Sequence, residues 1–347
     1  MIRRFSYIGC ILVSLTAVFT GCSLVDEDLT ACEGDFTINY ELHLVTNMTT
    51  EIQTQLGTAS NSPVAEALRT RLSGIFTDYA HDVDLSFYEV EGGAPLLHHE
   101  RHMMDASLTS YTLHIPVHQY MHVAVANVDG NDEVSLEQNG HCATAHLQQA
   151  IRDTVESHRT GLFAARIPMD VKEGVDQEFN VELNMVSAAS ALVLDTLGSH
   201  IKDIRVFASG FATGFNLADS TFTYNFTPLV RAEKLNAGTL AGTPLCFLTV
   251  SLPSRDVTDT KSQIEDTEPF ESETADEPLW QLKVYALRGD GTVTETVLGV
   301  KVPLRAGQLK VIKANVADDG SVIPRAPYVG AVVTLNWNEG TSWDIDF

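Results

Sequence analysis

The sequence predicts a mainly β protein built as β-sandwiches, and three features of the chain lead to this prediction. Apolar and polar residues alternate with period two in many short segments, as they do in half-buried strands. Gly, Asn and Asp turns separate those segments at regular spacing, which is typical of a sandwich. One convincing amphipathic helix lies in the first half, and no helix-period segment interrupts the strands of the second half.

Residues 1–21 have the pattern of a secretory signal peptide. Arg3 and Arg4 precede an apolar run over Tyr7–Phe19, which is shorter than the ~20 residues that a helix needs to span a bilayer. Cys22 directly follows Gly21, so the segment resembles a bacterial lipobox, in which that cysteine is acylated after cleavage. We expect a lipid anchor at Cys22; the alternative is an ordinary signal peptide with an incidental cysteine.

The composition limits the partners of the chain. With 46 acidic and 22 basic residues the net charge is −24, which disfavours nucleic acid and anionic lipid head groups as partners. We therefore expect no nucleic-acid partner, and we expect contact with the outer membrane only through the acyl chains. Residues 22–34 then form an acidic tether, in which Asp26, Glu27 and Asp28 resemble the surface-export signal of Bacteroidetes lipoproteins.

Three more cysteines follow Cys22, so at most one disulfide can form among them. Cys32 and Cys142 lie beside Gly, Asn or acidic residues, as loop cysteines do, whereas Cys246 lies inside an apolar run. An exported protein meets an oxidising compartment. We therefore expect a Cys32–Cys142 bridge and a buried free thiol at Cys246.

A first domain is expected over residues 35–175. Its predicted strands cover Phe36–Leu44, Val83–Phe87, Tyr111–Val117 and Met121–Val125. Between the first two strands, Ser62 can cap a helix that begins at Pro63. The apolar residues of that helix fall on one face, namely Val64, Leu68, Leu72, Ile75, Phe76 and Tyr79. A second, shorter helix is expected over Ala143–Val155, and both helices would cross over a sheet.

A second domain is expected over residues 176–347, with the boundary near Gly174–Gln177. Residues 255–278 are rich in acids and poor in large apolar groups, so we expect a mobile loop that joins two strands. The predicted strands of this domain are Phe179–Met185, Leu192–Leu194, Ile204–Ala208, Phe222–Phe226, Leu245–Phe247, Trp280–Val284, Val300–Val302 and Val333–Trp337.

The sequence holds no catalytic constellation, phosphate loop or dinucleotide fingerprint, so we expect neither an enzyme nor a cofactor. In a strand, His98, Glu100 and His102 would share one face. Such a face could hold a metal, but we interpret it as a solvated hairpin arm without one. Asn127–Asp132 resembles a calcium loop with its glycine misplaced, and Arg288–Gly291 contains an adhesion tripeptide; we interpret both as turns.

The start of the mature chain resembles a known family. The lipobox, Asp28–Cys32 and the strand Phe36–Leu44 resemble the opening of Bacteroidetes minor fimbrial subunits, the FimB-type anchor family of type V pili. Further segments are similar to that family, namely Val83–Val90 with Gly92 and Gly93, Tyr111–Val117, Tyr120–Val123 and the closing strand Val332–Trp337. The resemblance implies two tandem transthyretin-like β-sandwich domains, the first with one or two crossover helices. It also implies a surface lipoprotein that tethers or initiates a fimbrium through contacts with the shaft subunits.

In that family, shaft subunits lose their first strand by cleavage after an arginine, and a neighbour's strand fills the groove. No Lys or Arg occurs from Phe5 to Leu68, so the first strand of this chain is expected to stay in place, as suits an anchor. Apolar and acidic residues alternate near the C-terminus, which makes Trp343, Ile345 and Phe347 candidate partner-binding residues of a donor strand. The alternative is the last strand of the second domain's own sheet.

A second functional hypothesis is a glycan-binding surface lipoprotein of a polysaccharide-uptake system. Such proteins bind sugars on exposed aromatic platforms. Only three Trp are present, and Trp280 and Trp337 are in phase with core positions, which favours the fimbrial hypothesis.

Overall fold

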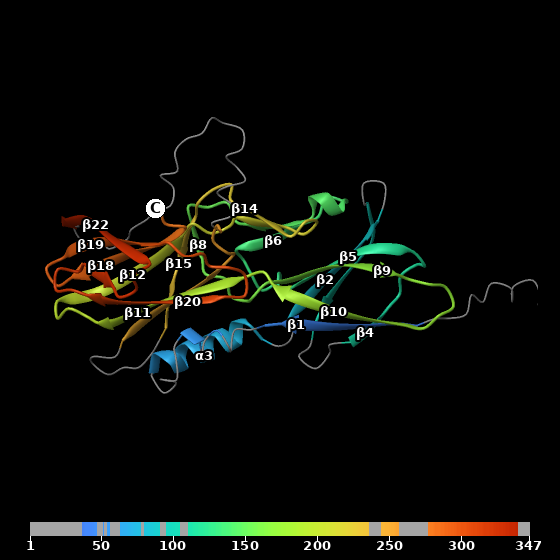
Figure 1. Cartoon of the computed structure of the whole chain (residues 1–347), viewed down its shortest axis with the longest axis horizontal. Coiled ribbons are helices and arrows are strands. Elements are labelled where there is room, and N and C mark those ends of the chain that lie inside the picture. The colour runs from blue at the N-terminus through green and yellow to red at the C-terminus, as the bar shows by residue number, and fades with distance from the viewer. Residues whose placement is uncertain are drawn as a thin grey trace, which may run out of the picture.

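The computed structural model describes residues 37–46, 51, 54–55, 63–77, 80–90, 95–104, 110–235, 244–256 and 277–338. The expected signal peptide and tether, the C-terminal segment after 338 and most of the expected acidic loop lie outside these residues. The described chain is mainly β, as predicted, and its strands form four sheets. Two sandwiches lie end to end along the long axis (Figure 1). No described helix is long and apolar enough to cross a bilayer.

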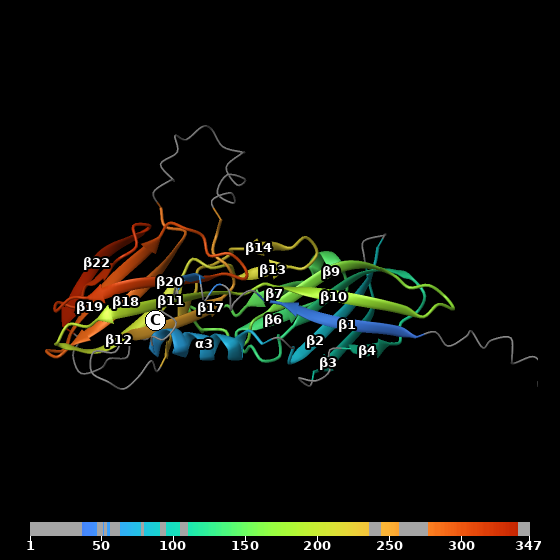
Figure 2. The same cartoon turned by 60° about the horizontal axis from the view of Figure 1, so that its bottom comes forward.

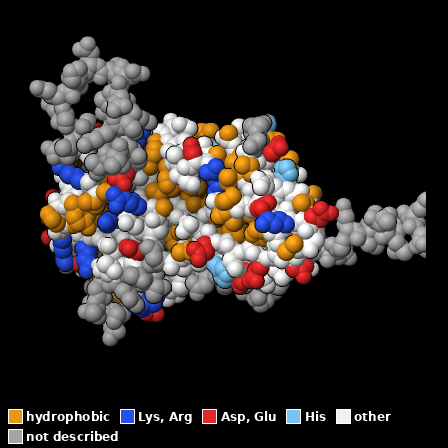
Figure 3. All heavy atoms as spheres, turned by 45° about the vertical axis from the view of Figure 1, so that its right-hand side comes forward, with side chains coloured by type: hydrophobic (Ala, Val, Ile, Leu, Met, Phe, Trp, Pro, Cys, Tyr) orange, Lys and Arg blue, Asp and Glu red, His pale blue; other side chains and the backbone are white. Residues whose placement is uncertain are grey.

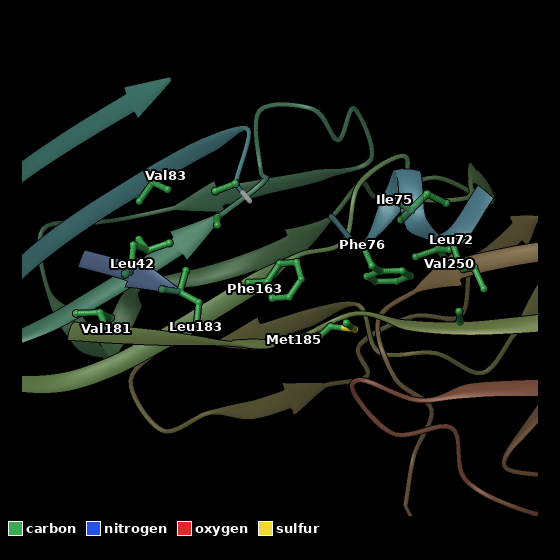
Figure 4. Packing of buried hydrophobic residues seen from close by; sticks show 14 of the residues in the cluster. Leu42, Leu72, Ile75, Phe76, Val83, Phe163, Val181, Leu183, Met185 and Val250 are labelled. Carbon is green, nitrogen blue, oxygen red and sulfur yellow. The ribbon is translucent and has the colours of Figure 1, made fainter. Parts of the chain in front are cut away.

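The first sandwich is one seven-stranded sheet folded over on itself. One layer holds β3 (Leu96–Met103), β2 (Asp82–Glu89), β5 (Gln119–Ala126) and β9 (Phe163–Asp170). The other layer holds β10 (Gln177–Met185), β1 (Ile38–Val45) and β4 (Ser110–Leu113). The layers join only where the first two residues of β9 pair with the last two of β10. Figure 4 shows Leu42, Val181 and Leu183 of one layer facing Val83 of the other, in one shared core.

One buried polar contact links the two layers. The Tyr40 hydroxyl of β1 lies 2.7 Å from Nε2 of His122 on β5, and Nδ1 of His122 lies 3.1 Å from the carbonyl oxygen of Ser86. A carbonyl oxygen can only accept, so Nδ1 donates to Ser86 and Nε2 accepts the Tyr40 hydroxyl. Both side chains are fully buried, and the neutral imidazole satisfies both partners. The only sequence signal for this contact was a histidine inside an apolar strand.

Helix α3 (Pro63–Ile75) forms where it was predicted, and Val64, Leu68, Leu72 and Ile75 are buried. We expected it to cross over the sheet of the first half, but it packs against β17 (Leu245–Ser251) of the second sandwich (Figure 2). Arg71 Nε also lies 2.8 Å from a Glu233 carboxylate oxygen. The apolar core therefore runs without a break from the first sandwich to α3 and β17.

The prediction of a second helix over Ala143–Val155 was wrong. The chain instead forms a 3₁₀ turn (Cys142–Thr144), β7 (His146–Gln149) and β8 (Thr154–Glu156). Leu147 and Gln149 are buried with period two, whereas Ile151 is 80% exposed, so the spacing of apolar residues by four does not mark one buried face. β7 joins β6 (Val134–Glu137), β13 (Gly214–Asn216) and β14 (Thr221–Thr223) in a four-stranded sheet that packs on the outer face of the first sandwich.

The second sandwich packs a five-stranded sheet on a six-stranded one. The first has the order β16 (Glu233–Leu235), β17, β11 (Ala188–Thr196), β20 (Leu309–Val316) and β21 (Val322–Pro324). The second has the order β22 (Val329–Asn338), β19 (Thr292–Val300), β18 (Trp280–Arg288), β12 (Ile201–Ser209), β15 (Leu229–Arg231) and β8. Alternate residues of β11 face α3 and the six-stranded sheet, so β11 is buried on both faces. Trp280 is buried in this core, as its phase predicted.

Sheet membership does not follow the expected division at 175/176. β10 begins at Gln177 yet belongs to the first sandwich, so the chain changes sandwich after Met185. β8 lies in the sequence of the first half but pairs with β15 in the second sandwich. The two halves are therefore interleaved, and neither sandwich is complete without strands or a helix from the other half.

The stability of the fold is predicted to fall with acid because two histidines are buried in the neutral form. Burial lowers the pKa of His122 and of His158 to about 4. An unfolded histidine binds its proton near pH 6.5, so each site stabilises the fold above pH 6.5 and loses that contribution as pH falls towards 4. The loss is roughly 3 kcal/mol per site at most. Urea unfolding between pH 7.5 and 4.5 measures it.

A matched pair of variants isolates this effect. His122→Phe should flatten the pH dependence of the unfolding free energy, whereas His200→Gln, at an exposed site, should leave it unchanged. An unfolding free energy that stays constant from pH 7.5 to 4.5 in the unaltered protein would contradict the prediction.

Candidate interaction surfaces

Of the site residues predicted from the sequence, Cys142 lies in the described part of the chain. Cys22, Cys32, Trp343, Ile345 and Phe347 lie outside it. The lipid anchor, the disulfide and the docking segment therefore stay predictions.

Cys142 opens the 3₁₀ turn and is buried in the apolar cluster beneath the four-stranded sheet. Burial raises the pKa of its thiol, and the Arg166 guanidinium beside it offsets part of that rise. Cys246 is also buried, as expected, and burial raises the pKa of its thiol to about 12. Both are free thiols in the described part of the chain, and Cys32 lies outside it.

The first strand is an integral part of its sandwich. All of β1, Ile38–Val45, pairs in parallel with Gln177–Asn184 of β10, and its first half pairs with β4 on the other side. Ile38, Tyr40 and Leu42 are at most 3% exposed. Removal of β1 would therefore leave the backbone edges of two strands unpaired and would open the core between the layers.

The last described strand, β22, is an edge of the second sandwich. It pairs along its length with β19 and has no partner on its other side among the described residues. Val332 and Val333 are 59% and 48% exposed. Neighbouring residues of a strand point to opposite faces, so β22 exposes apolar side chains on both faces as well as an open backbone edge. A long apolar edge of this kind is a template for a strand of another chain.

The histidine cluster lies on β3, the edge strand of its layer. His98 Nε2 and His102 Nε2 each lie within hydrogen-bond distance of a different Glu100 carboxylate oxygen, at 2.7 and 2.9 Å. Burial alone would raise the pKa of Glu100, but the two hydrogen bonds outweigh it and leave that pKa lowered. The three residues share one face, as predicted, but they are half-buried rather than fully solvated. No group of ligands that could hold a metal ion occurs among the described residues.

The two loops that resembled binding motifs are turns. In the first, the Asp82 carboxylate accepts the backbone N–H groups of Val128 and Asp129. In the second, Gly291 closes the turn between β18 and β19 by donating its N–H to the Arg288 carbonyl oxygen at 3.1 Å. Asn131 Oδ1 accepts the Arg159 N–H, and Asp290 Oδ1 accepts the Thr292 N–H, so polar side chains of both turns are used by nearby backbone.

The surface is divided by charge and polarity. On the face shown in Figure 3, Lys and Arg side chains gather over the second sandwich, and Asp and Glu side chains gather over the first. Hydrophobic side chains are exposed between these two ends.

Several solved structures are similar to this chain. The fimbrial anchor protein Mfa2 of Porphyromonas gingivalis has 11% sequence identity, covers 87% of this chain and 96% of its own, and has a TM-score of 0.43. The tip fimbrial protein Mfa3 of the same organism has 9% identity, with coverages of 86% and 99% and a TM-score of 0.41. A Bacteroides thetaiotaomicron protein described as a candidate polysaccharide-binding protein has 9% identity, with coverages of 86% and 98% and a TM-score of 0.49.

No protein-family model matches the chain, and no curated protein sequence matches it. The resemblance to fimbrial proteins that the sequence suggested is thus found among solved structures.

The disulfide prediction can be checked directly. Mass spectrometry of non-reduced peptides from the exported protein should find Cys32 joined to Cys142 and Cys246 unmodified, because Cys246 is fully buried. Denaturation in an alkylating reagent provides the control, since it should label Cys246 alone. Alkylation of both Cys32 and Cys142 in that experiment would rule the bridge out.

Proposed function

We propose that this protein is an outer-membrane surface lipoprotein that acts as a fimbrial anchor or accessory subunit. It would tether or initiate a fimbrium by strand-addition contacts with the shaft subunits. The observation that carries the proposal is the position of β1, which pairs with β10 along its whole length and with β4 over its first half. No cofactor, catalytic step or nucleic-acid contact is part of this role.

Strand addition needs an empty groove in the subunit that accepts the strand. A subunit that polymerises by strand addition has to lose a strand before it can accept one. Here the first strand lies in a sequence without Lys or Arg from Phe5 to Leu68, so a protease specific for basic residues has no site at which to release it. A subunit whose groove is already filled accepts no donor strand there. A fimbrium that contains such a subunit would therefore end at that subunit. This property supports an anchor or another terminal subunit.

The two ends of the molecule suit two different contacts. The expected acylated Cys22 precedes β1 through a short acidic tether, which supports attachment of the first sandwich to the outer membrane. At the other end, β22 leads into the segment that contains Trp343, Ile345 and Phe347. Large apolar side chains in that segment would each contribute ~1.5 to 3 kcal/mol if a partner's groove buried them. We propose that the shaft subunit binds the β22 edge and this segment.

Cys22→Ala should release the protein from the outer membrane, because the acyl chains are the only attachment in the proposal. Cell fractionation in detergent-free buffer measures this, with Ser23→Ala as a control that stays attached. Continued sedimentation of Cys22→Ala with membranes would show that the lipid is not the anchor.

Val332→Lys should weaken the hold on fimbriae, because a lysine on an exposed edge strand opposes pairing with another strand. A loss of ~1.4 kcal/mol would raise the ratio of shed to cell-bound fimbriae about tenfold. Val175→Lys is the matched control, since Val175 is 50% exposed in the turn between β9 and β10, far from β22 in the sequence. Immunoblotting of medium and cells gives the ratio.

Deletion of Ser342–Phe347 tests the other part of the docking proposal. The truncated protein should fold and stay on the cell surface, yet shed its fimbriae. Unfolding of the truncated protein would show that the segment is a core strand. Retention of fimbriae by a folded truncated protein would show that docking occurs elsewhere.

A further inference from the structure

A pocket of about 360 Å³ lies between the first sandwich and the four-stranded sheet. Its floor is apolar and mostly buried, and is formed by Met185, Val186, Phe215 and Leu217. The ring centroids of Phe222 and Phe215 are 4.8 Å apart, and the half-exposed Phe222 side chain forms one wall of the pocket. The exposed rim carries the polar side chains of Arg166, Asn184 and Ser220. The volume is that of a small binding site, and the pocket presents apolar side chains and polar groups in about equal measure.

The wall of the pocket on the β13–β14 side is held in place by local hydrogen bonds. The Leu217 N–H donates to the Ala145 carbonyl oxygen of the adjoining turn at 3.0 Å. The Asp219 carboxylate accepts both the N–H and the hydroxyl of Thr221. Ser220 adopts a positive φ of 59°, which is uncommon for a residue other than Gly, Asn or Asp. The pocket is thus shaped before a ligand arrives, which reduces the entropy lost on binding.

Arg166 gives the pocket its charge. The lining contains no Asp or Glu, although the chain has 46 acidic residues. Among the described arginines, all except Arg166 and Arg255 lie within 4.0 Å of a carboxylate oxygen. Arg255 instead lies over the Tyr224 ring. Arg166 is exposed and its side chain hydrogen-bonds Cys142. A guanidinium has five N–H donors, so Arg166 keeps donors for a carboxylate from outside.

The pocket also lies where β9 and β10 separate. The two strands pair only through Phe163-Ala164 and Asn184-Met185. From Ala165 onward, β9 pairs only with β5, and its other edge has no partner among the described residues. Before Asn184, β10 pairs only with β1, and its other edge is likewise open in the described chain. Backbone N–H and C=O groups next to the pocket are thus open to an extended peptide, which could present alternate side chains to the pocket.

We propose that this pocket binds an extended segment of a protein partner in which an apolar side chain neighbours a carboxylate. The apolar side chain fills the floor over Phe215 and Leu217, and the carboxylate forms a bidentate pair with Arg166. A sugar ring fits less well, because its hydroxyl groups would be buried against Met185, Val186 and Phe215 with few polar partners. The identification of the partner as a fimbrial subunit rests on the proposed function, whereas the chemistry of the bound segment does not.

The test uses the purified chain without its signal and a fluorescent peptide with the sequence of Ser342–Phe347 itself, Ser-Trp-Asp-Ile-Asp-Phe, which alternates apolar and acidic residues. Fluorescence anisotropy should show binding that weakens with added salt, and a peptide with both Asp replaced by Asn should bind about tenfold more weakly. Arg166→Gln should cause a similar loss. Arg159→Gln, at an exposed arginine paired with Asp132, should leave the affinity unchanged.

A second variant and a competitor complete the test. Ala306→Phe places a large side chain at the half-exposed rim and should block the peptide without touching Arg166. Equal affinity of the unaltered protein, Arg166→Gln and Ala306→Phe would overturn the proposal, as would displacement of the peptide by oligogalacturonate at lower concentrations than by unlabelled peptide. Because binding is measured on the isolated protein, its failure is distinct from loss of fimbrial anchoring in cells.

Discussion

The parallel pairing of β1 with β10 places the first strand of the first sandwich beside its last strand. The buried side chains of these two strands form one side of the core between the two layers. Tyr40 on β1 then reaches across the core to His122 on β5, and this hydrogen bond ties one layer to the other. Because His122 is neutral and both of its nitrogens are used, the contact favours one register of β1 against the opposite layer. Without β1 the first sandwich has no complete second layer.

This constraint decides which surfaces remain for partners. The groove that strand addition would use is occupied, and β4 covers only the first half of the outer edge of β1. The second sandwich offers the open edge of β22, and the junction beside β13 and β14 offers the pocket with Arg166. α3 joins the two sandwiches through one core, so a pull on β22 would be transmitted to the first sandwich through packed side chains.

β1 and β10 alternate between buried and exposed residues, and α3 buries one face, so the sequence predicted all three within a few residues. β2, β5 and β11 were also predicted, although they are buried on both faces, because their large apolar residues still recur with period two. β20 was missed because its burial does not alternate strictly, and β7 was mistaken for a helix because three apolar residues happen to be spaced by four. The pocket was invisible in the sequence, since its lining comes from separate segments around Arg166, Phe222 and Ala306 that only the folded chain brings together. The interleaving of the halves by β8 is equally non-local.

The central claim is that β1 stays in its sandwich in the working surface protein. Hydrogen exchange followed by mass spectrometry, on protein isolated with its fimbriae attached, tests this claim most directly. The account predicts that the peptide over Ile38–Val45 is recovered. The amides of its first half, Ile38–Glu41, should exchange as slowly as those of β5 (Gln119–Ala126), since both segments have a paired strand on each side. Absence of that peptide, or exchange as fast as that of an unpaired strand, would contradict it.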